Sequence, residues 1–265
     1  MQLKSIIKDL CPPLFLRTLT GMFYGWKGNY TSWAEASAQA SGYDSEIILN
    51  RVKNALLKVK NGEAVYERDS VIFDKVSYSF PLLSALSLIA LKNNRKLNVL
   101  DFGGSLGSSY YQNRAFFADL EQFNWCIVEQ KHFVDEGKKT FADKNLHFFY
   151  DIDSCIQHHK IDVLLLSSVL QYLEKPYGFI DSVLAKNIPY IIIDRAPMFA
   201  VGHDRITLQT VPKAIYEAKY PCWILNEKKV LNAILKQYDL VFEVQTEETI
   251  NINDAAFKAF FFKKK

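Results

Sequence analysis

The chain has 265 residues, enough for one α/β domain with an extension, and 49% of them are hydrophobic, as in a folded globular protein. Its 32 basic and 29 acidic residues are well mixed and give a formal net charge of +3, which excludes an obvious nucleic-acid footprint. The four cysteines lie far apart in no paired metal-ligand spacing, so we expect reduced thiols, a cytoplasmic protein and no metal site.

The first part of the chain, residues 1–95, is predicted to be a mainly helical extension or cap. Apolar residues recur at helical spacing from Ile47 to Val59 and again from Leu82 to Leu91. No stretch approaches the roughly 18 apolar residues of a transmembrane helix. Residues 1–20 mix apolar residues with lysines, so peripheral contact with a membrane surface is an alternative to packing on the domain.

A glycine-rich turn follows the first strand of the second part. The apolar run up to Leu100 ends in Asp101 and breaks into glycines before the helical pattern of residues 108–120. Glycines let the backbone turn tightly and approach a ligand, and the following helix offers free N–H groups. A carboxylate at this place repels a pyrophosphate and suits a cationic ligand. A simple strand-to-helix turn is the alternative interpretation.

This turn resembles the first motif of the class I S-adenosylmethionine-dependent methyltransferases, Asp/Glu-x-Gly-x-Gly-x-Gly. Asp101, Gly103 and Gly107 fall on the motif positions. Ser105 stands in place of the middle glycine, with Gly104 beside it. The resemblance implies that these five residues bind S-adenosyl-L-methionine and that S-adenosylhomocysteine is the product. That cofactor carries a sulfonium and an ammonium and no phosphate.

From residue 96 onward, short apolar runs alternate with helical segments, which predicts a parallel sheet in an α/β domain spanning residues 96–265. Strands are predicted at residues 98–102, 125–129, 146–149, 162–167 and 190–194. After a helix at 227–237, two runs at 240–244 and 256–262 with no helix between them must pair antiparallel. The predicted fold class is therefore α/β, a Rossmann-like class I methyltransferase sheet with a C-terminal antiparallel hairpin, helices on both faces and an N-terminal helical cap.

Ligands of such sheets gather at the carboxyl ends of the strands. Glu129 follows the second predicted strand, where a carboxylate can accept both hydroxyls of a ribose; the alternative is a surface acid. By resemblance to the family, Asp151 stands where adenine is contacted. Ser167 and Ser168, after the fourth strand, stand where the methionine end is bound.

Four further residues are candidates for the acceptor side. The resemblance places Gln171 and Tyr172 next to the acceptor, and Tyr172 is also a candidate catalytic residue. Trp33 and Tyr43 belong to the predicted cap. They are either core anchors or, if the cap covers the sheet edge, aromatic faces on which a sugar stacks.

The fifth predicted strand ends in a charged pair, Asp194 and Arg195. Charges leaving a buried strand are either paired with each other or used for binding. In the following loop, His203 or Asp204 is a candidate base for an acceptor hydroxyl. Arg195 or Arg205 is a candidate for holding an acidic acceptor. Because methyl transfer depends chiefly on in-line placement, positioning can matter more than a base.

A narrower resemblance extends over nearly the whole chain. An ordered set of motifs is similar to a bacterial family of incompletely characterised methyltransferases; the motifs are GNYTSWAEA at 28–36, SGYD at 41–44, DFGGSLGSSYYQNR at 101–114, SSVLQYLEKP at 167–176, IIIDRAP at 191–197 and YPCW at 220–223. Members often accompany genes for surface polysaccharides. This implies a role in polysaccharide biosynthesis with a sugar or glycan precursor as acceptor.

Three functions remain open from the sequence. The first is an S-adenosylmethionine-dependent methyltransferase acting on oxygen of a small or carbohydrate-linked acceptor. The second is a non-catalytic methyltransferase-like binding module, which Ser105 in the motif leaves open. The third, an NAD(P)-dependent Rossmann oxidoreductase, is disfavoured by Asp101 and by the terminal hairpin. The sequence predicts no oligomeric state.

Overall fold

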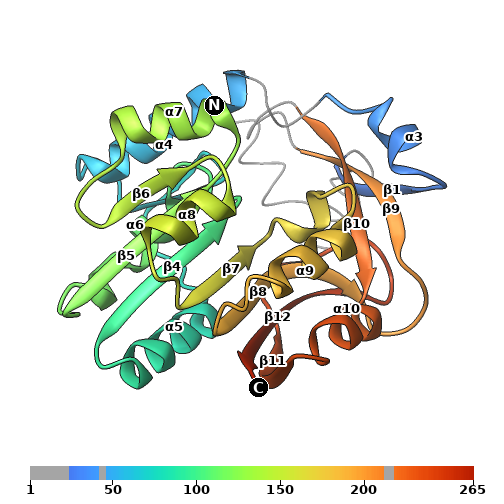
Figure 1. Cartoon of the computed structure of the whole chain (residues 1–265). Coiled ribbons are helices and arrows are strands. Elements are labelled where there is room, and N and C mark those ends of the chain that lie inside the picture. The colour runs from blue at the N-terminus through green and yellow to red at the C-terminus, as the bar shows by residue number, and fades with distance from the viewer. Residues whose placement is uncertain (1–23, 42–45, 212–217) are drawn as a thin grey trace.

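A computed structural model describes residues 24–41, 46–211 and 218–265 of the chain. Its centre is a twisted, mainly parallel sheet with helices on both faces (Figure 1). Tyr43, Cys11 and the segment 1–20, on which the membrane alternative depends, lie outside the described residues.

The parallel part of the sheet has the strand order β8-β7-β4-β5-β6. Its strands are β4 (Lys96–Phe102), β5 (Gln122–Val128), β6 (Leu146–Phe149), β7 (Val163–Ser167) and β8 (Tyr190–Phe199), which confirms the five predicted strands. From β4 the chain adds strands outward to β6 and then returns to the other side of β4. The switch point between β4 and β7 is where ligands of open α/β sheets bind.

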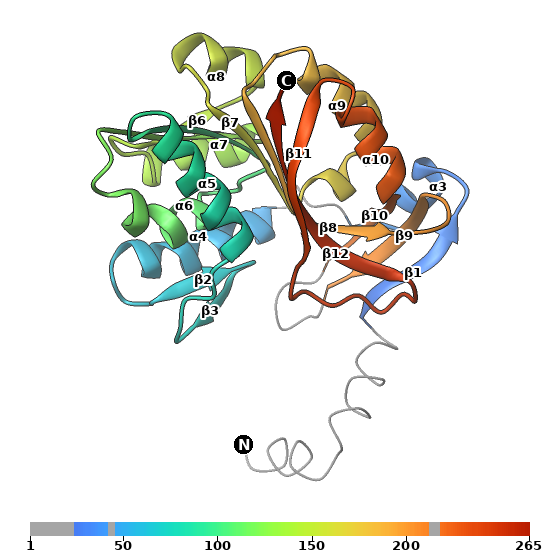
Figure 2. The ribbon, with the colours of Figure 1, turned by 90° about the horizontal axis from the view of Figure 1, so that it is seen from below.

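The sheet separates two hydrophobic clusters because successive strand residues point to opposite faces. Val99 joins one cluster with α4 (Glu46–Lys60), α5 (Phe80–Lys92), α6 (Ser108–Asn113) and α7 (Lys131–Thr140). Leu100, the next residue, joins the other with α8 (Ile152–His158), α9 (Pro176–Leu184) and α10 (Glu227–Ile234). Figure 2 shows α4, α5 and α6 on one side and α8, α9 and α10 on the other. Burial on both faces explains the nearly continuous apolar runs.

The predicted C-terminal hairpin is present. β12 (Ala255–Lys264) lies antiparallel between β8 and β11 (Tyr238–Gln245). Its register places Phe260 opposite Ile193 and Phe262 opposite Ile191. These large side chains are buried and bind the hairpin to the sheet.

The segment before residue 96 is less helical than predicted. Helices α4 and α5 are present, and Ser32 caps the short helix α3 (Trp33–Ser37). The segment also contains three strands, namely β1 (Gly25–Tyr30), β2 (Tyr66–Arg68) and β3 (Val71–Phe73). β2 and β3 form a hairpin whose turn residues Asp69 and Ser70 have φ of 52° and 67°. Two positive φ values are typical of a two-residue hairpin turn, but the turn lacks the usual glycine, so it was not predicted. The domain boundary at residue 95 stays a prediction.

The fifth strand was predicted to end at Asp194, but β8 continues to Phe199. β7 ends at Ser167, directly opposite Asp194. Beyond that point β10 (Lys219–Asn226) takes the place of β7 beside β8, and β9 (Arg205–Thr210) and β1 follow it. We call β1, β9 and β10 the antiparallel extension (Figure 1). β8 continues because β12 pairs along its whole length.

A clasp joins the β11–β12 loop to the antiparallel extension. Asn251 accepts a hydrogen bond from the Trp26 N–H at 2.8 Å and donates one to the Trp26 carbonyl at 3.1 Å. A Cβ on Gly25 would lie 2.6 Å from the amide oxygen of Asn251. The close approach of this loop to β1 therefore depends on glycine at that position.

Candidate functional site

The glycine loop, residues 103–107, connects β4 to α6 at the switch point. Gly103 and Gly107 have φ of 74° and 107°, which favour glycine. A Cβ on Gly103 would lie 2.4 Å from a methyl of Val169, and one on Gly104 would lie 2.5 Å from Oδ2 of Asp101. The loop backbone therefore packs directly on the Asp101 carboxylate and on the segment after β7.

Asp101, near the end of β4, is 1% exposed. Trp125 on β5 donates its indole N–H to Oδ2 of Asp101 at 2.9 Å. Burial raises the pKa of Asp101 to about 7, although the Trp125 hydrogen bond and the charge of Arg195 both lower it. A cation bound at the loop would favour the ionised carboxylate, so the site suits a cationic ligand.

Ser105, which replaces the middle glycine of the motif, has φ of 53°. It therefore adopts the left-handed conformation that glycine would adopt, at a cost on the order of 1 kcal/mol. Its hydroxyl oxygen is buried and has no hydrogen-bond partner among the described residues. The loop shape therefore survives the substitution.

Glu129 lies where the sequence predicted it, just after β5. Burial raises its pKa, while hydrogen bonds from the backbone N–H groups of Gln130 and Ser105 lower it. One carboxylate therefore connects the end of β5 to the glycine loop. Asp151 follows β6 and caps α8 by accepting the N–H of Ser154 at 2.7 Å. Glu129 and Asp151 thus follow neighbouring strands at the same edge of the sheet.

The polar residues after β7 form a connected group. The Ser167 hydroxyl donates to Oδ2 of Asp194 at 2.9 Å, and the Ser168 N–H donates to the Asp194 carbonyl at 2.8 Å. Gln171 donates its side-chain amide to the Ser168 hydroxyl at 3.0 Å. The amide oxygen of Gln171 is buried without a hydrogen-bond partner among the described residues. Ser168 has φ of 55°, so this group also contains backbone strain.

Asp194 is fully buried and joins several elements. It accepts a hydrogen bond from Ser79, the N-cap residue of α5, at 3.0 Å, and it pairs with Nε of Arg195 at 3.2 Å. Arg195 also donates from Nη2 to Ser167 at 3.0 Å. The ion-pair interpretation of Asp194 and Arg195 is therefore confirmed. Arg195 has φ of 54°, in the middle of β8 where one neighbouring strand replaces another.

A cavity of about 760 Å³ opens beside this ion pair; we call it the edge cavity. Its walls come from β2, the start of α5, the end of α6, β8 and the end of β11 with the following loop. The residues that line it are Arg68, Ser77 to Leu82, Ser84, Gln112, Asp194, Arg195 and Phe242 to Glu248. Asp194 lines this cavity and also accepts the hydrogen bond from Ser167, so the cavity lies next to the polar residues that follow β7.

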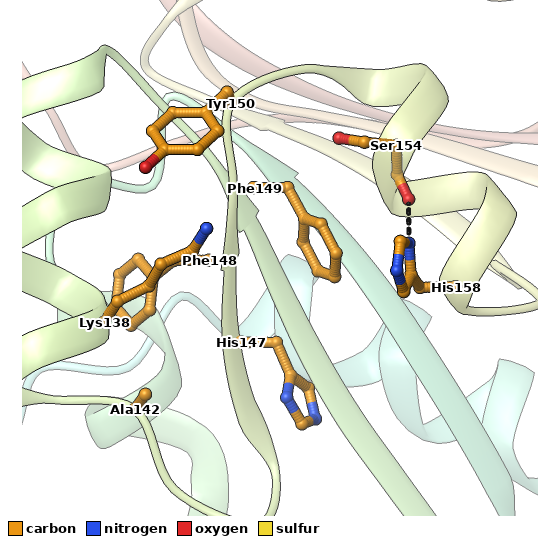
Figure 3. Close-up of a pocket in the computed structure, with 8 residues that line it drawn as sticks. All are labelled: Lys138, Ala142, His147, Phe148, Phe149, Tyr150, Ser154 and His158. Atoms are coloured by element: carbon orange, nitrogen blue, oxygen red, sulfur yellow. Dashed lines mark hydrogen bonds between the residues drawn. The ribbon is translucent and has the colours of Figure 1, made fainter.

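A second hollow, of about 370 Å³, lies at the edge strand β6 between α7 and α8 (Figure 3). Figure 3 shows Lys138 beside Tyr150, with its Nζ 4.3 Å from the ring centroid, and His158 bonded to the Ser154 carbonyl. Unlike the edge cavity, which Asp194 lines, this hollow is lined neither by Asp194 nor by its partners Ser167 and Ser168, nor by any glycine-loop residue. It is therefore separate from the candidate site.

Two candidate bases lie away from the glycine loop. His203 is exposed in the turn between β8 and β9. Asp204 accepts hydrogen bonds from Tyr177 at 2.6 Å and from Lys229 at 2.7 Å, on the α9 and α10 side of the molecule. The five residues of β8 beyond Asp194 span roughly 16 Å at the usual rise of a strand. The structure therefore does not bring His203 and Asp204 into the site.

Three further acceptor-side candidates fix the antiparallel extension. Arg205 donates from Nε to the Gly28 carbonyl at 2.8 Å, which joins β9 to β1. Tyr172 donates its hydroxyl to Gln209 at 2.8 Å. Trp33 stacks on Trp223 of β10 with ring centroids 6.0 Å apart. Each of these side chains therefore has a structural role in the fold. None of the three lines the edge cavity.

Several residues of the site were not predicted from the sequence. Trp125 lies within an apolar strand and looked like an ordinary core residue. Glu67 on β2 is 1% exposed, accepts a hydrogen bond from Ser108 at the start of α6, and has a pKa raised to about 7 by burial. Ser79 and Arg68 also escaped notice. Of these residues, only Ser79 is marked by a local pattern. A serine two residues before Pro81 is typical of the start of a helix, here α5.

None of the helices in the described part of the chain is long and apolar enough to cross a membrane.

The sequence matches no protein-family model and no curated protein. Among solved structures, the N-terminal domain of EvdMO1, crystallised with S-adenosylhomocysteine and D-fucose, is 9% identical with a TM-score of 0.50, over 80% of this chain and 97% of that one. Magnesium protoporphyrin IX methyltransferase of Synechocystis PCC 6803 is 12% identical with a TM-score of 0.48, over 85% and 100%. A Burkholderia thailandensis 1,6-didemethyltoxoflavin-N1-methyltransferase is 12% identical with a TM-score of 0.45, over 91% and 94%.

The chain thus has the Rossmann-like fold of class I methyltransferases, as predicted: a mainly parallel sheet closed by an antiparallel hairpin.

Proposed function

We propose that this protein is an S-adenosylmethionine-dependent methyltransferase that binds its cofactor over the glycine loop. The observation that carries the proposal is the buried Asp101 carboxylate, packed beneath Gly104 and held by Trp125, at the switch point of this fold. A buried acid with a pKa near 7 gains most from a cationic ligand. The same carboxylate would repel a dinucleotide pyrophosphate, which disfavours an oxidoreductase.

The residues of the site fit this cofactor. Asp101 would attract the ammonium group, and Ser167 and Ser168 would border the methionine end. Glu129 and Asp151 would face the ribose and the adenine, and Ser105 keeps the loop in the left-handed conformation that the middle glycine of the motif would adopt. When bound, the cofactor supplies a methyl group activated by its positively charged sulfur. The chain's own contribution is to bind and orient the two reactants and to exclude water.

Solved structures with this fold support the cofactor. The N-terminal domain of EvdMO1 was crystallised with S-adenosylhomocysteine, and the Synechocystis enzyme with S-adenosylmethionine. We propose oxygen of a small or carbohydrate-linked molecule as the acceptor, and D-fucose in the EvdMO1 crystals is consistent with such an acceptor. The cytoplasmic location and the link to polysaccharide genes stay predictions.

Calorimetric titration of the full chain with S-adenosylhomocysteine and, separately, with NAD tests the proposal. We expect micromolar binding of S-adenosylhomocysteine and none of NAD. Binding of NAD alone would overturn the proposal. If S-adenosylhomocysteine binds but no methyl group is transferred from radiolabelled cofactor to any acceptor of a broad panel, the non-catalytic binding module becomes the better description.

A further inference from the structure

The edge cavity joins segments that lie far apart in the sequence. Arg68 comes from the β2–β3 hairpin, Ser79 from the start of α5, Arg195 from β8, and Thr246 from the loop after β11. In Figure 2 the β2–β3 hairpin and α5 lie on one side and the β11–β12 hairpin on the other. Ser79 and Arg195 both contact Asp194, which connects the cavity wall to Ser167 at the switch point. The cavity is thus placed to hold a second ligand next to one bound over the glycine loop.

The charges of the edge cavity disfavour an anionic ligand. Both arginines that line it are already paired: Arg68 with Glu248 at 3.1 Å and Arg195 with Asp194 at 3.2 Å. Two further carboxylates, Glu243 and Glu247, also line it, so acidic residues of the lining outnumber basic ones, although Glu243 lies 3.8 Å from Nζ of Lys258. An anionic acceptor would meet this excess negative charge and would have to displace an existing partner of an arginine. This argues against the prediction that Arg195 holds an acidic acceptor.

The uncharged polar groups that line the edge cavity suit a ligand that carries hydroxyl groups. The lining contains the hydroxyls of Ser77, Ser79, Ser84 and Thr246 and the amides of Gln112 and Gln245. The hydroxyl oxygen of Thr246 is buried and has no hydrogen-bond partner among the described residues. Carboxylates only accept hydrogen bonds and guanidinium groups only donate them, and the edge cavity presents both. A hydroxyl group can satisfy either kind, because it donates and accepts.

The aromatic side chains of Tyr78 and Phe80 belong to the lining of the cavity. Phe80 is 65% exposed, and its ring centroid lies 6.3 Å from that of Tyr78. Phe116, also exposed, packs edge-on against Tyr78 at 5.1 Å. Exposed aromatic faces offer apolar area to a ligand that also carries polar groups. The C–H face of a sugar-type ring combines with its hydroxyls to meet both requirements.

We infer that the edge cavity binds the acceptor and that this acceptor is an uncharged polyhydroxylated molecule of the sugar type. Its hydroxyls meet the ion pairs, Thr246 and the amides, while its ring packs on Tyr78 and Phe80. The inference rests on the proposed function, because only a cofactor over the glycine loop makes the ligand of the adjacent cavity an acceptor.

Saturation-transfer NMR on the full chain with S-adenosylhomocysteine tests the inference. The probes are neutral methyl hexopyranosides and methyl pentopyranosides, each compared with its uronic acid or its phosphate ester. We expect saturation transfer to at least one neutral glycoside and at least threefold less to its anionic counterpart. Equal or stronger transfer to the anionic probes, or no transfer to any neutral glycoside, would overturn the inference.

Two variants and one control variant locate the binding. Phe80→Ala should lower the signal at least threefold, whereas Leu91→Ala, which truncates a 75% exposed residue at the other end of α5, should leave it unchanged. Thr246→Val should also lower it by removing the unpartnered hydroxyl. Equal signals in Phe80→Ala and Leu91→Ala would place the glycoside elsewhere. Calorimetry with S-adenosylhomocysteine on the same samples reports separately whether the proposed function holds.

Discussion

The indole N–H of Trp125 on β5 donates a 2.9 Å hydrogen bond to the carboxylate of Asp101 on the neighbouring strand β4. It is one of the interactions that favour ionisation of this buried acid. The bond fixes the carboxylate beneath the glycine loop, where a Cβ at residue 104 would touch it.

Asp101→Asn should weaken S-adenosylhomocysteine binding at least tenfold at pH 8. The change keeps the size of the side chain but removes the charge that attracts the ammonium group. Isothermal titration calorimetry measures the effect, and Asp119→Asn, at an exposed position, is the matched control. An affinity loss of less than twofold would mean that Asp101 has only a structural role.

Affinity for S-adenosylhomocysteine should rise between pH 6 and pH 8. The pKa of Asp101 is raised to about 7 by burial, so in the free protein the group is largely protonated at pH 6. An ammonium group favours the ionised carboxylate, so binding releases a proton and strengthens as the pH rises. Titrations at pH 6, 7 and 8 check this trend. The trend should be lost in Asp101→Asn, and an identical slope in that variant would assign the proton to another group.

Glu67→Gln should make stability less dependent on pH. Burial raises the pKa of Glu67 to about 7, so the folded protein keeps a proton that the unfolded chain loses near pH 4 to 5. The free energy of unfolding of the parent protein therefore falls as the pH rises from about 4.5 to 7. The glutamine variant lacks this loss, so relative to the parent it should gain on the order of 2–3 kcal/mol between pH 5 and pH 8.

Urea unfolding at both pH values measures the difference. Glu63→Gln, at an exposed position on the loop before β2, is the control. A constant difference between Glu67→Gln and the parent at pH 5 and pH 8 would contradict the prediction.

Gly104→Ala should abolish detectable cofactor binding. The added methyl would lie 2.5 Å from Oδ2 of Asp101, so either the loop or the carboxylate must move. Such overpacking costs about 1–3 kcal/mol, which thermal unfolding would register. Gly178→Ala is the matched control, because a Cβ there meets its nearest atom at 3.9 Å. Unchanged S-adenosylhomocysteine affinity in Gly104→Ala would exclude this loop as the cofactor site.

Ser105→Gly should change S-adenosylhomocysteine affinity by less than threefold. Ser105 already has φ of 53°, so glycine would relieve strain without changing the shape of the loop. Stability should change by less than about 1 kcal/mol, since glycine also raises the entropy of the unfolded chain. Calorimetry of the parent and variant decides the point. Binding more than tenfold tighter in the variant would show that the serine impairs the site.

The parallel sheet was predictable because its strands are buried on both faces and therefore read as apolar runs. The closing hairpin was predictable because two neighbouring runs with no helix between them must pair antiparallel. The antiparallel extension was not, because β9 and β10 form only where β8 continues past Asp194. That continuation depends on pairing with β12, which lies more than 50 residues further along the chain. For this reason His203 and Asp204 follow a longer β8 and lie away from the glycine loop.

The glycine loop and Glu129 were predictable from local patterns that end in a glycine or an acid after a strand. Trp125 was not, because a tryptophan in an apolar run gives no sign that its N–H serves a carboxylate. Glu67 and Arg68 lie on a three-residue strand far from the loop in sequence. The β2–β3 hairpin packs on α6 and so brings these two residues to the site. No local sequence pattern predicts this contact.

The clasp between Asn251 and Trp26 holds one wall of the edge cavity against β1. The loop that carries Thr246 and Glu248 is tied by Asn251 to both backbone polar groups of Trp26 on β1. Swinging this loop outward would break both hydrogen bonds at once. We therefore expect this loop to stay against β1 when a ligand enters the edge cavity.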